Sequence, residues 1–178
     1  FVVRSDFADF GARYFTPAEE IPLAGHPTIA TVFALVETGR LKLDSYLKIP
    51  LELRDGPIDV EIFASAGRVE RVVMSQRKPQ FLRIYSPEQA LSAFGLSAAD
   101  LLPGACIQTV STGTPQLFIP LKNLDSLRRS QVDMQKFAAL RQTGDFFSVH
   151  PFCLQGLERG QTFARHFALL PDIAEDPF

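Results

Sequence analysis

The sequence contains one stretch, residues 28–38, that is apolar on almost every face of a helix. Apolar residues recur there at the i, i+3, i+4 and i+7 spacing of one helical face, and most other positions are also apolar. Pro27 suits the first position of a helix, and Gly39 suits a left-handed C-cap. We therefore predict a central helix at 28–38 that is buried on nearly all sides, so that replacing Phe33 by Ala costs roughly 3–5 kcal/mol.

Most of the remaining chain has the pattern of short strands. Residues 58–62 alternate between aliphatic and acidic side chains, as in a strand with one buried face. Ser86 and Gln89 form a capping box at the start of a short helix that Gly95 closes. Short connections favour antiparallel pairing, so the sequence predicts a mixed α+β fold. The predicted strands are 1–4, 10–15, 47–53, 58–62, 68–75, 81–85, 106–110, 116–121, 146–154 and 162–169, and further helices are predicted at 125–129 and 133–141.

The residues before the apolar helix are the first candidates for chemistry. Gly25 and His26 lie at its predicted N-terminus, where free N–H groups and the positive end of the dipole suit a carboxylate or an enolate. The dipole also disfavours imidazolium, so His26 is predicted to be neutral and able to exchange a proton. Two alternatives stay open: His26 only caps the turn, and Gly25 only supplies an unusual backbone angle. His150 and His166 lie between apolar residues of predicted strands, and we interpret both as structural.

Composition narrows the class of protein. The chain has 178 residues, of which 46% are hydrophobic and 21% charged, which is ordinary for a globular protein of one or two domains. A net charge of −2 gives no reason to expect nucleic acid as a partner. No apolar run of transmembrane length and no signal peptide is visible, so no membrane partner is expected. Cys106 and Cys153 are isolated, which predicts buried free thiols in a cytoplasmic protein.

Metal, phosphate and nucleophile chemistry find little support in the sequence. The histidines and cysteines lack the spacings of metal-binding motifs, and no glycine-rich phosphate-binding motif occurs. No serine has the sequence context of a nucleophile elbow. Proton transfer at carbon remains, and it needs a base, an acid and donors for the enolate-like charge. We therefore expect neither a metal site nor a cofactor.

Motifs spaced along the whole chain resemble one protein family. Arg-Tyr-Phe-Thr-Pro at 13–17, Glu20, and Leu-Ala-Gly-His-Pro-Thr at 23–28 resemble the signature of the phenazine-biosynthesis PhzF-like family, which shares its fold with diaminopimelate epimerases. Val-Ser-Thr-Gly-Thr-Pro at 110–115 resembles the motif that opens the family's second half. Further along, Arg-His-Phe and Ala-Glu-Asp-Pro, at 165–167 and 174–177, resemble the run leading to its second active-site loop.

This resemblance implies a fold and a set of site residues. The fold would have two similar halves, 1–111 and 112–178, each a mostly antiparallel sheet wrapped around a central helix. His26 and Asp176 would be catalytic and share one cleft between the halves, and the substrate-binding residues would be Gly25, Gly113 and Thr114. By composition alone, the run at Asp176 is a solvated turn, and the segment at Gly113 is almost as readily a hairpin turn.

The resemblance places further family elements outside residues 1–178. The catalytic Glu of the family precedes a Phe-Val strand that matches the start of this chain, so it would lie just before Phe1. A Gly-Ser loop and the second central helix would follow Phe178, which would leave the second-half strands without a helix to cover their apolar face. We therefore expect residues 1–178 to be inactive as an isomerase and less stable than a longer version.

Two functions are consistent with the sequence. The first is a PhzF-like, cofactor-independent isomerase or epimerase that transfers a proton at carbon in a small carboxylated metabolite, with a homodimer as one assembly open to it. The second is a non-catalytic domain of the same fold that binds a metabolite or a partner. The residue shortly before Phe1 in the reading frame separates them, since Glu there favours the isomerase.

Overall fold

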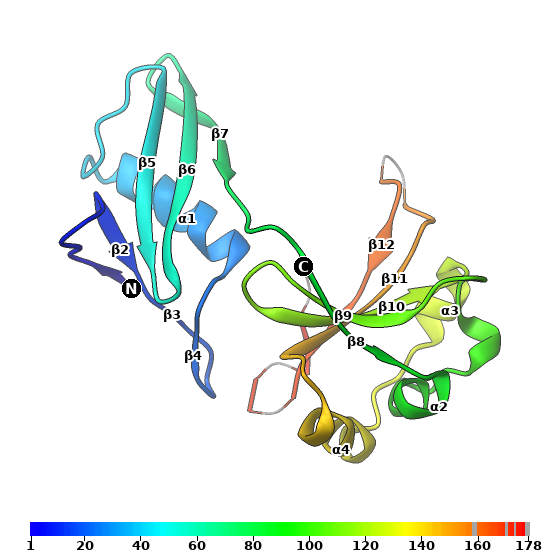
Figure 1. The fold of residues 1–178 in the computed structure, drawn as a ribbon. Helices are drawn as coiled ribbons and strands as arrows, with labels where there is room; N and C mark the ends of the chain where they lie inside the picture. Colours follow the sequence, from blue (N-terminus) through cyan, green and yellow to red (C-terminus); the bar gives the residue numbers. More distant parts are fainter. Residues whose placement is uncertain (158–159, 170, 173, 177–178) are drawn as a thin grey trace. The chain divides into compact units, whose positions relative to one another are not determined.

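The computed structural model forms two compact units, Phe1–Lys78 and Pro79–Phe178 (Figure 1). It describes residues 1–157, 160–169, 171–172 and 174–176. Both units combine β-sheet with helices, so the predicted mixed α+β class is confirmed.

The first unit is built on a five-stranded sheet with the order β1-β2-β5-β6-β7 and on the separate hairpin β3-β4. Strands β2 and β5 pair in parallel, and the other neighbours pair antiparallel. The alternation predicted for 58–62 is confirmed, because Ile58, Val60 and Ile62 are all buried. The elements are β1 (Val2–Val3), β2 (Phe10–Ala12), β3 (Tyr14–Phe15), β4 (Glu20–Ile21), α1 (Gly25–Glu37), β5 (Tyr46–Leu53), β6 (Gly56–Ser65) and β7 (Arg68–Met74).

Helix α1 covers the predicted residues, but its burial differs from the prediction. Within the described part of the chain one face packs against the sheet, whereas Ala30 and Ala34 are exposed. The prediction of a helix buried on nearly all sides is therefore wrong, because the sheet of this unit covers a single face. Phe33 is half-buried, so replacing it by Ala should cost less than the roughly 3–5 kcal/mol of a fully buried Phe. The buried residues of α1 are Thr28, Val32 and Leu35.

The second unit holds a seven-stranded sheet in which β14-β13-β11-β10-β9-β8 are neighbours and β12 also pairs with β11. Strands β10 and β11 pair in parallel across a helical connection, and the remaining pairs are antiparallel. The predicted strand at 162–169 is interrupted at Arg165. The elements are β8 (Gln80–Tyr85), α2 (Pro87–Ala90), η1 (Leu91–Phe94), η2 (Ala98–Asp100), β9 (Ile107–Ser111), β10 (Pro115–Leu121), α3 (Leu124–Arg129), α4 (Met134–Thr143), β11 (Ser148–Cys153), β12 (Phe163–Ala164), β13 (His166–Phe167) and β14 (Glu175–Asp176).

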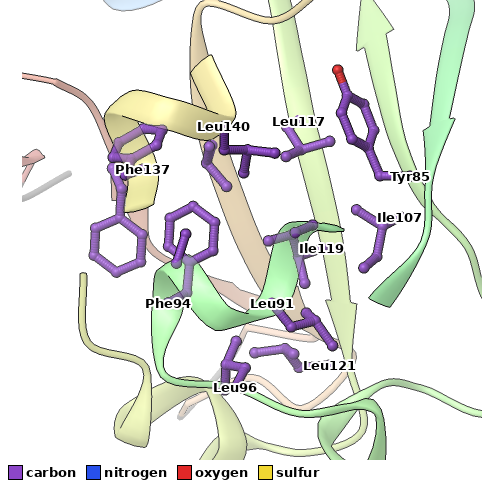
Figure 2. Close-up of a cluster of buried hydrophobic side chains, with 14 of the residues drawn as sticks. Tyr85, Leu91, Phe94, Leu96, Ile107, Leu117, Ile119, Leu121, Phe137 and Leu140 are labelled. Carbon is purple, nitrogen blue, oxygen red and sulfur yellow. The ribbon is translucent and has the colours of Figure 1, made fainter. Parts of the chain in front are cut away.

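Short helices cover one face of this second sheet (Figure 2). Phe94 of η1 and Phe137 of α4 are fully buried, and they belong to one apolar cluster with Leu117 and Ile119 of β10. The expectation of an apolar face without a covering helix stays a prediction for the opposite face, where the half-buried Val110, Phe118 and Phe152 line an open, mainly apolar hollow. The local signals for short helices were present in the sequence, but their apolar residues were not assigned to the core of this sheet.

The boundary between the units also differs from the one that the family motif suggested. The predicted halves were 1–111 and 112–178, whereas the compact units meet at Lys78 and Pro79. The reason is strand pairing, because β8 pairs with β9 and β9 pairs with β10, so residues 80–111 belong to the second sheet.

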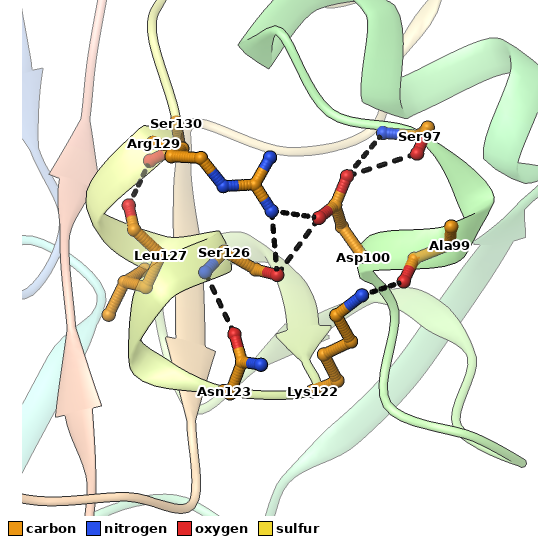
Figure 3. Close-up of polar contacts among 9 residues, drawn as sticks. All are labelled: Ser97, Ala99, Asp100, Lys122, Asn123, Ser126, Leu127, Arg129 and Ser130. Atoms are coloured by element: carbon orange, nitrogen blue, oxygen red, sulfur yellow. Dashed lines mark hydrogen bonds and ion pairs between the residues drawn. The ribbon is translucent and has the colours of Figure 1, made fainter.

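A buried carboxylate joins η2 to α3 in the second unit (Figure 3). Asp100 is only 6% exposed, and its Oδ2 accepts hydrogen bonds from the backbone N–H and the hydroxyl of Ser97, both at 3.0 Å. Its Oδ1 accepts from the Ser126 hydroxyl at 2.9 Å and from Arg129 Nη2 at 2.7 Å. Burial raises the pKa of Asp100, but these hydrogen bonds outweigh it and hold the pKa at about 2.

Replacing Asp100 by Asn should destabilise the second unit by about 2 kcal/mol at pH 7. Because the pKa in the folded state is below the ordinary value of 3.8, this stabilisation is present above pH 3.8 and is lost as the pH falls towards 2. Urea denaturation at pH 7 and at pH 3 should show a smaller difference between the two proteins at the lower pH. Asp125→Asn, at an exposed carboxylate of α3, is the control. If wild type and Asp100→Asn differ in the free energy of unfolding by the same amount at both pH values, the lowered pKa of Asp100 would not be the source of the stabilisation.

Candidate functional site

The residues that precede α1 are buried, whereas the first residues of the helix are exposed to solvent. Leu23 and Ala24 are buried, and the Thr28 hydroxyl donates to the Ala24 carbonyl oxygen at 2.6 Å. Gly25 and His26, the first two residues of the helix, are both exposed. A Cβ added to Gly25 would meet no heavy atom of the described residues within 4 Å. A ligand can therefore approach the backbone N–H groups at this end of the helix.

Ionic contacts hold the hairpin that leads to this helix. The Arg54 guanidinium donates to the backbone carbonyl of Glu20 at 2.8 Å and lies 3.8 Å from its Oε2. Arg13 lies 3.7 Å from Glu20 Oε1 and 3.5 Å from Glu52 Oε1. Glu20, one of the residues that carry the family resemblance, therefore links β4 to the sheet of the first unit.

Gly113 and Thr114 lie in the turn between β9 and β10. Both are half-buried, and the Gly113 N–H donates to the Ser111 hydroxyl oxygen at 3.2 Å. Ser111 is also paired with Pro115 across the two strands. This is the hairpin turn that the sequence left open as an alternative, and substrate binding by the two residues stays a prediction.

Strand pairing places Asp176 in register with both histidines that the sequence analysis interpreted as structural. Phe118 of β10 pairs with His150 of β11, and His166 of β13 pairs with Asp176 of β14. The ring centroids of Phe118 and His150 are 5.5 Å apart, and those of His150 and His166 are 4.3 Å apart with an interplanar angle of 13°. These four residues form a row across the sheet, which sequence analysis missed because strand register is not a local property.

The environment of the histidine pair lowers the pKa of His150. Burial lowers the pKa of His150, and the neighbouring His166 lowers it further, to about 4, so the His150 ring is neutral at pH 7. The Ser148 hydroxyl donates to Gln116 Oε1 and lies 2.6 Å from His166 Nε2. The Ser148 hydroxyl thus links Gln116 of β10 to His166 of β13.

Each predicted site residue has a place within one unit. Gly25 and His26 belong to the first unit, whereas Gly113, Thr114 and Asp176 belong to the second. The prediction that His26 and Asp176 share one cleft stays a prediction.

Three further expectations concern metals, membranes and thiols. Among the residues that the structure describes, no group of three or more His, Cys, Asp and Glu side chains could hold a metal ion. No helix within the described ranges is long and apolar enough to cross a membrane. Both cysteines are free thiols, and Cys153 is buried as predicted. The prediction of burial is wrong for Cys106, which is exposed because it lies in the connection that precedes β9.

The chain is similar to proteins of one family along its whole length. A family model described as phenazine biosynthesis-like protein matches residues 1–178. The crystal structure of a phenazine biosynthesis protein of the PhzF family from Bacillus anthracis is 32% identical, with a TM-score of 0.82. That match covers 100% of this chain and 60% of the Bacillus anthracis chain.

Curated relatives show the same similarity. An uncharacterized isomerase of Bacillus subtilis, YfhB, is 31% identical over 170 residues, which is 94% of this chain and 57% of YfhB. The trans-2,3-dihydro-3-hydroxyanthranilate isomerase of Pseudomonas aeruginosa is 27% identical over 170 residues, 93% of this chain and 55% of that enzyme. The chain thus spans a little over half the length of these relatives. Since the family model matches from the first residue to the last, the chain belongs to the phenazine biosynthesis-like, or PhzF, family.

Proposed function

We propose that the protein is a cofactor-independent isomerase or epimerase that transfers a proton at a carbon of a small carboxylated metabolite. The observation that carries the proposal is the N-terminus of α1, where the exposed Gly25 and His26 follow the buried Leu23 and Ala24. Backbone N–H groups and the positive end of a helix stabilise the negative charge of a carboxylate or an enolate. The isomerase names of the two curated relatives support the same class of reaction.

Each residue has a separate role in this mechanism. Gly25 leaves the helix end accessible to the substrate carboxylate, and His26 exchanges a proton with the reacting part of the substrate. Asp176 holds the substrate or returns the proton, and the turn at Gly113 lines the site. The family resemblance implies that the general base is a Glu, and the assay therefore uses the whole gene product.

A non-catalytic binding domain of the same fold has less support, since the curated relatives described above are named as isomerases. The cytoplasmic location and the homodimer stay predictions. Binding without turnover is the result that would favour this alternative.

The test follows hydrogen exchange with the solvent at carbon. The whole gene product and residues 1–178 are each incubated in deuterium oxide with trans-2,3-dihydro-3-hydroxyanthranilate, the compound that names the Pseudomonas aeruginosa relative, and with a panel of small carboxylated metabolites. We expect the whole gene product to incorporate deuterium at one carbon of at least one compound. Addition of a metal chelator should leave the rate unchanged. Calorimetric binding of a panel member without any deuterium incorporation would contradict the proposal.

A further inference from the structure

Arg165, between β12 and β13, uses all three guanidinium nitrogens. Nε donates to Glu175 Oε1 at 2.6 Å and Nη2 donates to Glu175 Oε2 at 2.7 Å, which is a bidentate pair. Nη1 donates to the carbonyl oxygens of Leu127 at 3.2 Å and Ser130 at 2.7 Å, and to the Ser130 hydroxyl at 2.8 Å. Arg165 thus connects Glu175 to the C-terminal end of α3, where a cation is favoured by the helix dipole.

The strand that Arg165 holds is short. Glu175 and Asp176 make up the whole of β14, and Asp176 pairs with His166. One more backbone hydrogen bond, from the Ala168 N–H to the Ala174 carbonyl oxygen at 3.2 Å, continues the pairing of this segment. A ladder of two residues gives little stability by itself. Contacts of neighbouring side chains therefore decide how firmly the backbone at Asp176 is held.

We propose that Arg165 is a positioning residue that fixes the backbone of Asp176 by clamping Glu175 to α3. The inference deepens the proposed function, because it assigns the residue that holds one of its site positions. An exposed ion pair would contribute little, but the Arg165 side chain is only 22% exposed and makes further hydrogen bonds to α3. Lysine cannot replace it, since an ammonium group does not span a carboxylate and two backbone carbonyls with fixed geometry.

The test measures local and global stability separately. Hydrogen exchange at the Ala168 amide is followed by NMR in wild type, Arg165→Lys and Glu175→Gln, and unfolding is followed in urea. The control is Lys136→Gln, which removes another ion pair of the second unit, between Lys136 and Asp133 at 3.4 Å. We expect exchange at Ala168 to be roughly tenfold faster in Arg165→Lys and in Glu175→Gln, and unchanged in the control. An unchanged rate in Glu175→Gln would overturn the proposal even if Arg165→Lys fails to fold.

Activity gives a second, independent reading. In the solvent exchange assay with the whole gene product, Arg165→Lys should lower kcat roughly tenfold with little change in KM, because a displaced group affects the reaction more than binding. Equal values of kcat in Arg165→Lys and wild type would overturn the proposal. If the wild type shows no turnover, faster exchange at Ala168 in both variants still supports the clamp, and the failure then belongs to the proposed function.

Discussion

His26→Asn in the whole gene product should lower deuterium incorporation at carbon by about 10²–10⁴-fold, the usual contribution of a positioned acid or base. Asn keeps a polar side chain at the N-terminus of α1 but cannot exchange a proton near neutral pH. His26 is exposed, so the folded state should lose little stability. The rate is measured by NMR in deuterium oxide, with the urea midpoint as the measure of folding.

The control for His26→Asn lies on the same helix. Ala34 is exposed in α1, and Ala34→Gln keeps a residue that favours helix while leaving the N-terminus unaltered. We expect its exchange rate to match that of wild type. If His26→Asn keeps the full rate as well, then proton transfer belongs to another group, and only the charge-stabilising role of the helix N-terminus would remain.

The existence of α1 could be predicted from the sequence, whereas its environment could not. Gly39 follows the helix with a left-handed φ of 68°, as predicted, but the helix begins at Gly25, two residues before Pro27, so Pro27 is not its first residue. The apolar spacing of residues 28–38 predicted a helix there, and the helix covers almost all of them. Apolar residues on every side of a helix show that any side can be buried, but they do not predict which side packs against the sheet. Ala30 and Ala34 are exposed because the sheet of the first unit reaches only the opposite face.

Local signals in the second unit were similarly reliable. Ser86 forms the predicted capping box with Gln89, and Gly95 has the left-handed φ of 64° that closes the following turn. The packing of these turns onto the sheet depends on pairs of residues far apart in the sequence. The early boundary at Lys78 also follows from strand pairing, since β8 pairs with β9, the next strand, and not with β7, the strand before it.

The candidate site likewise has a part that a local motif predicts and a part that depends on strand pairing. His26 was found from a local motif at a helix end, and the structure places it there. The row of Phe118, His150, His166 and Asp176 depends on three strand pairings, one of them a parallel pair across a long connection. Such a register is set by the packed sheet and not by any short motif. In the sequence, Arg165 is only one residue of a family motif. The five hydrogen bonds of its guanidinium group appear only in the folded structure.

The largest expected loss of stability follows replacement of Phe94 by Ala. Phe94 is fully buried, with its ring centroid 5.3 Å from that of Phe137 and 5.9 Å from that of Phe167. These contacts join η1, α4 and β13, so removal of the ring leaves a cavity that no single element can close. Deletion of a buried aromatic ring costs roughly 3–5 kcal/mol. Urea denaturation monitored by circular dichroism should show a clearly lower midpoint.

A second Phe of the same unit tests whether burial, and not the loss of an aromatic ring as such, causes this effect. Phe81 lies on β8 and is 69% exposed, so Phe81→Ala should change the free energy of unfolding by no more than about 0.5 kcal/mol. The two variants remove the same atoms from the same unit and differ mainly in the surface that is left behind. Similar midpoints for the two variants would mean that the contacts of η1 with α4 and β13 do not stabilise the sheet. In that case the packing of Phe94 on Phe167 would not hold β13 in place. Arg165 directly precedes β13, so its contact with Glu175 would then lack a fixed support.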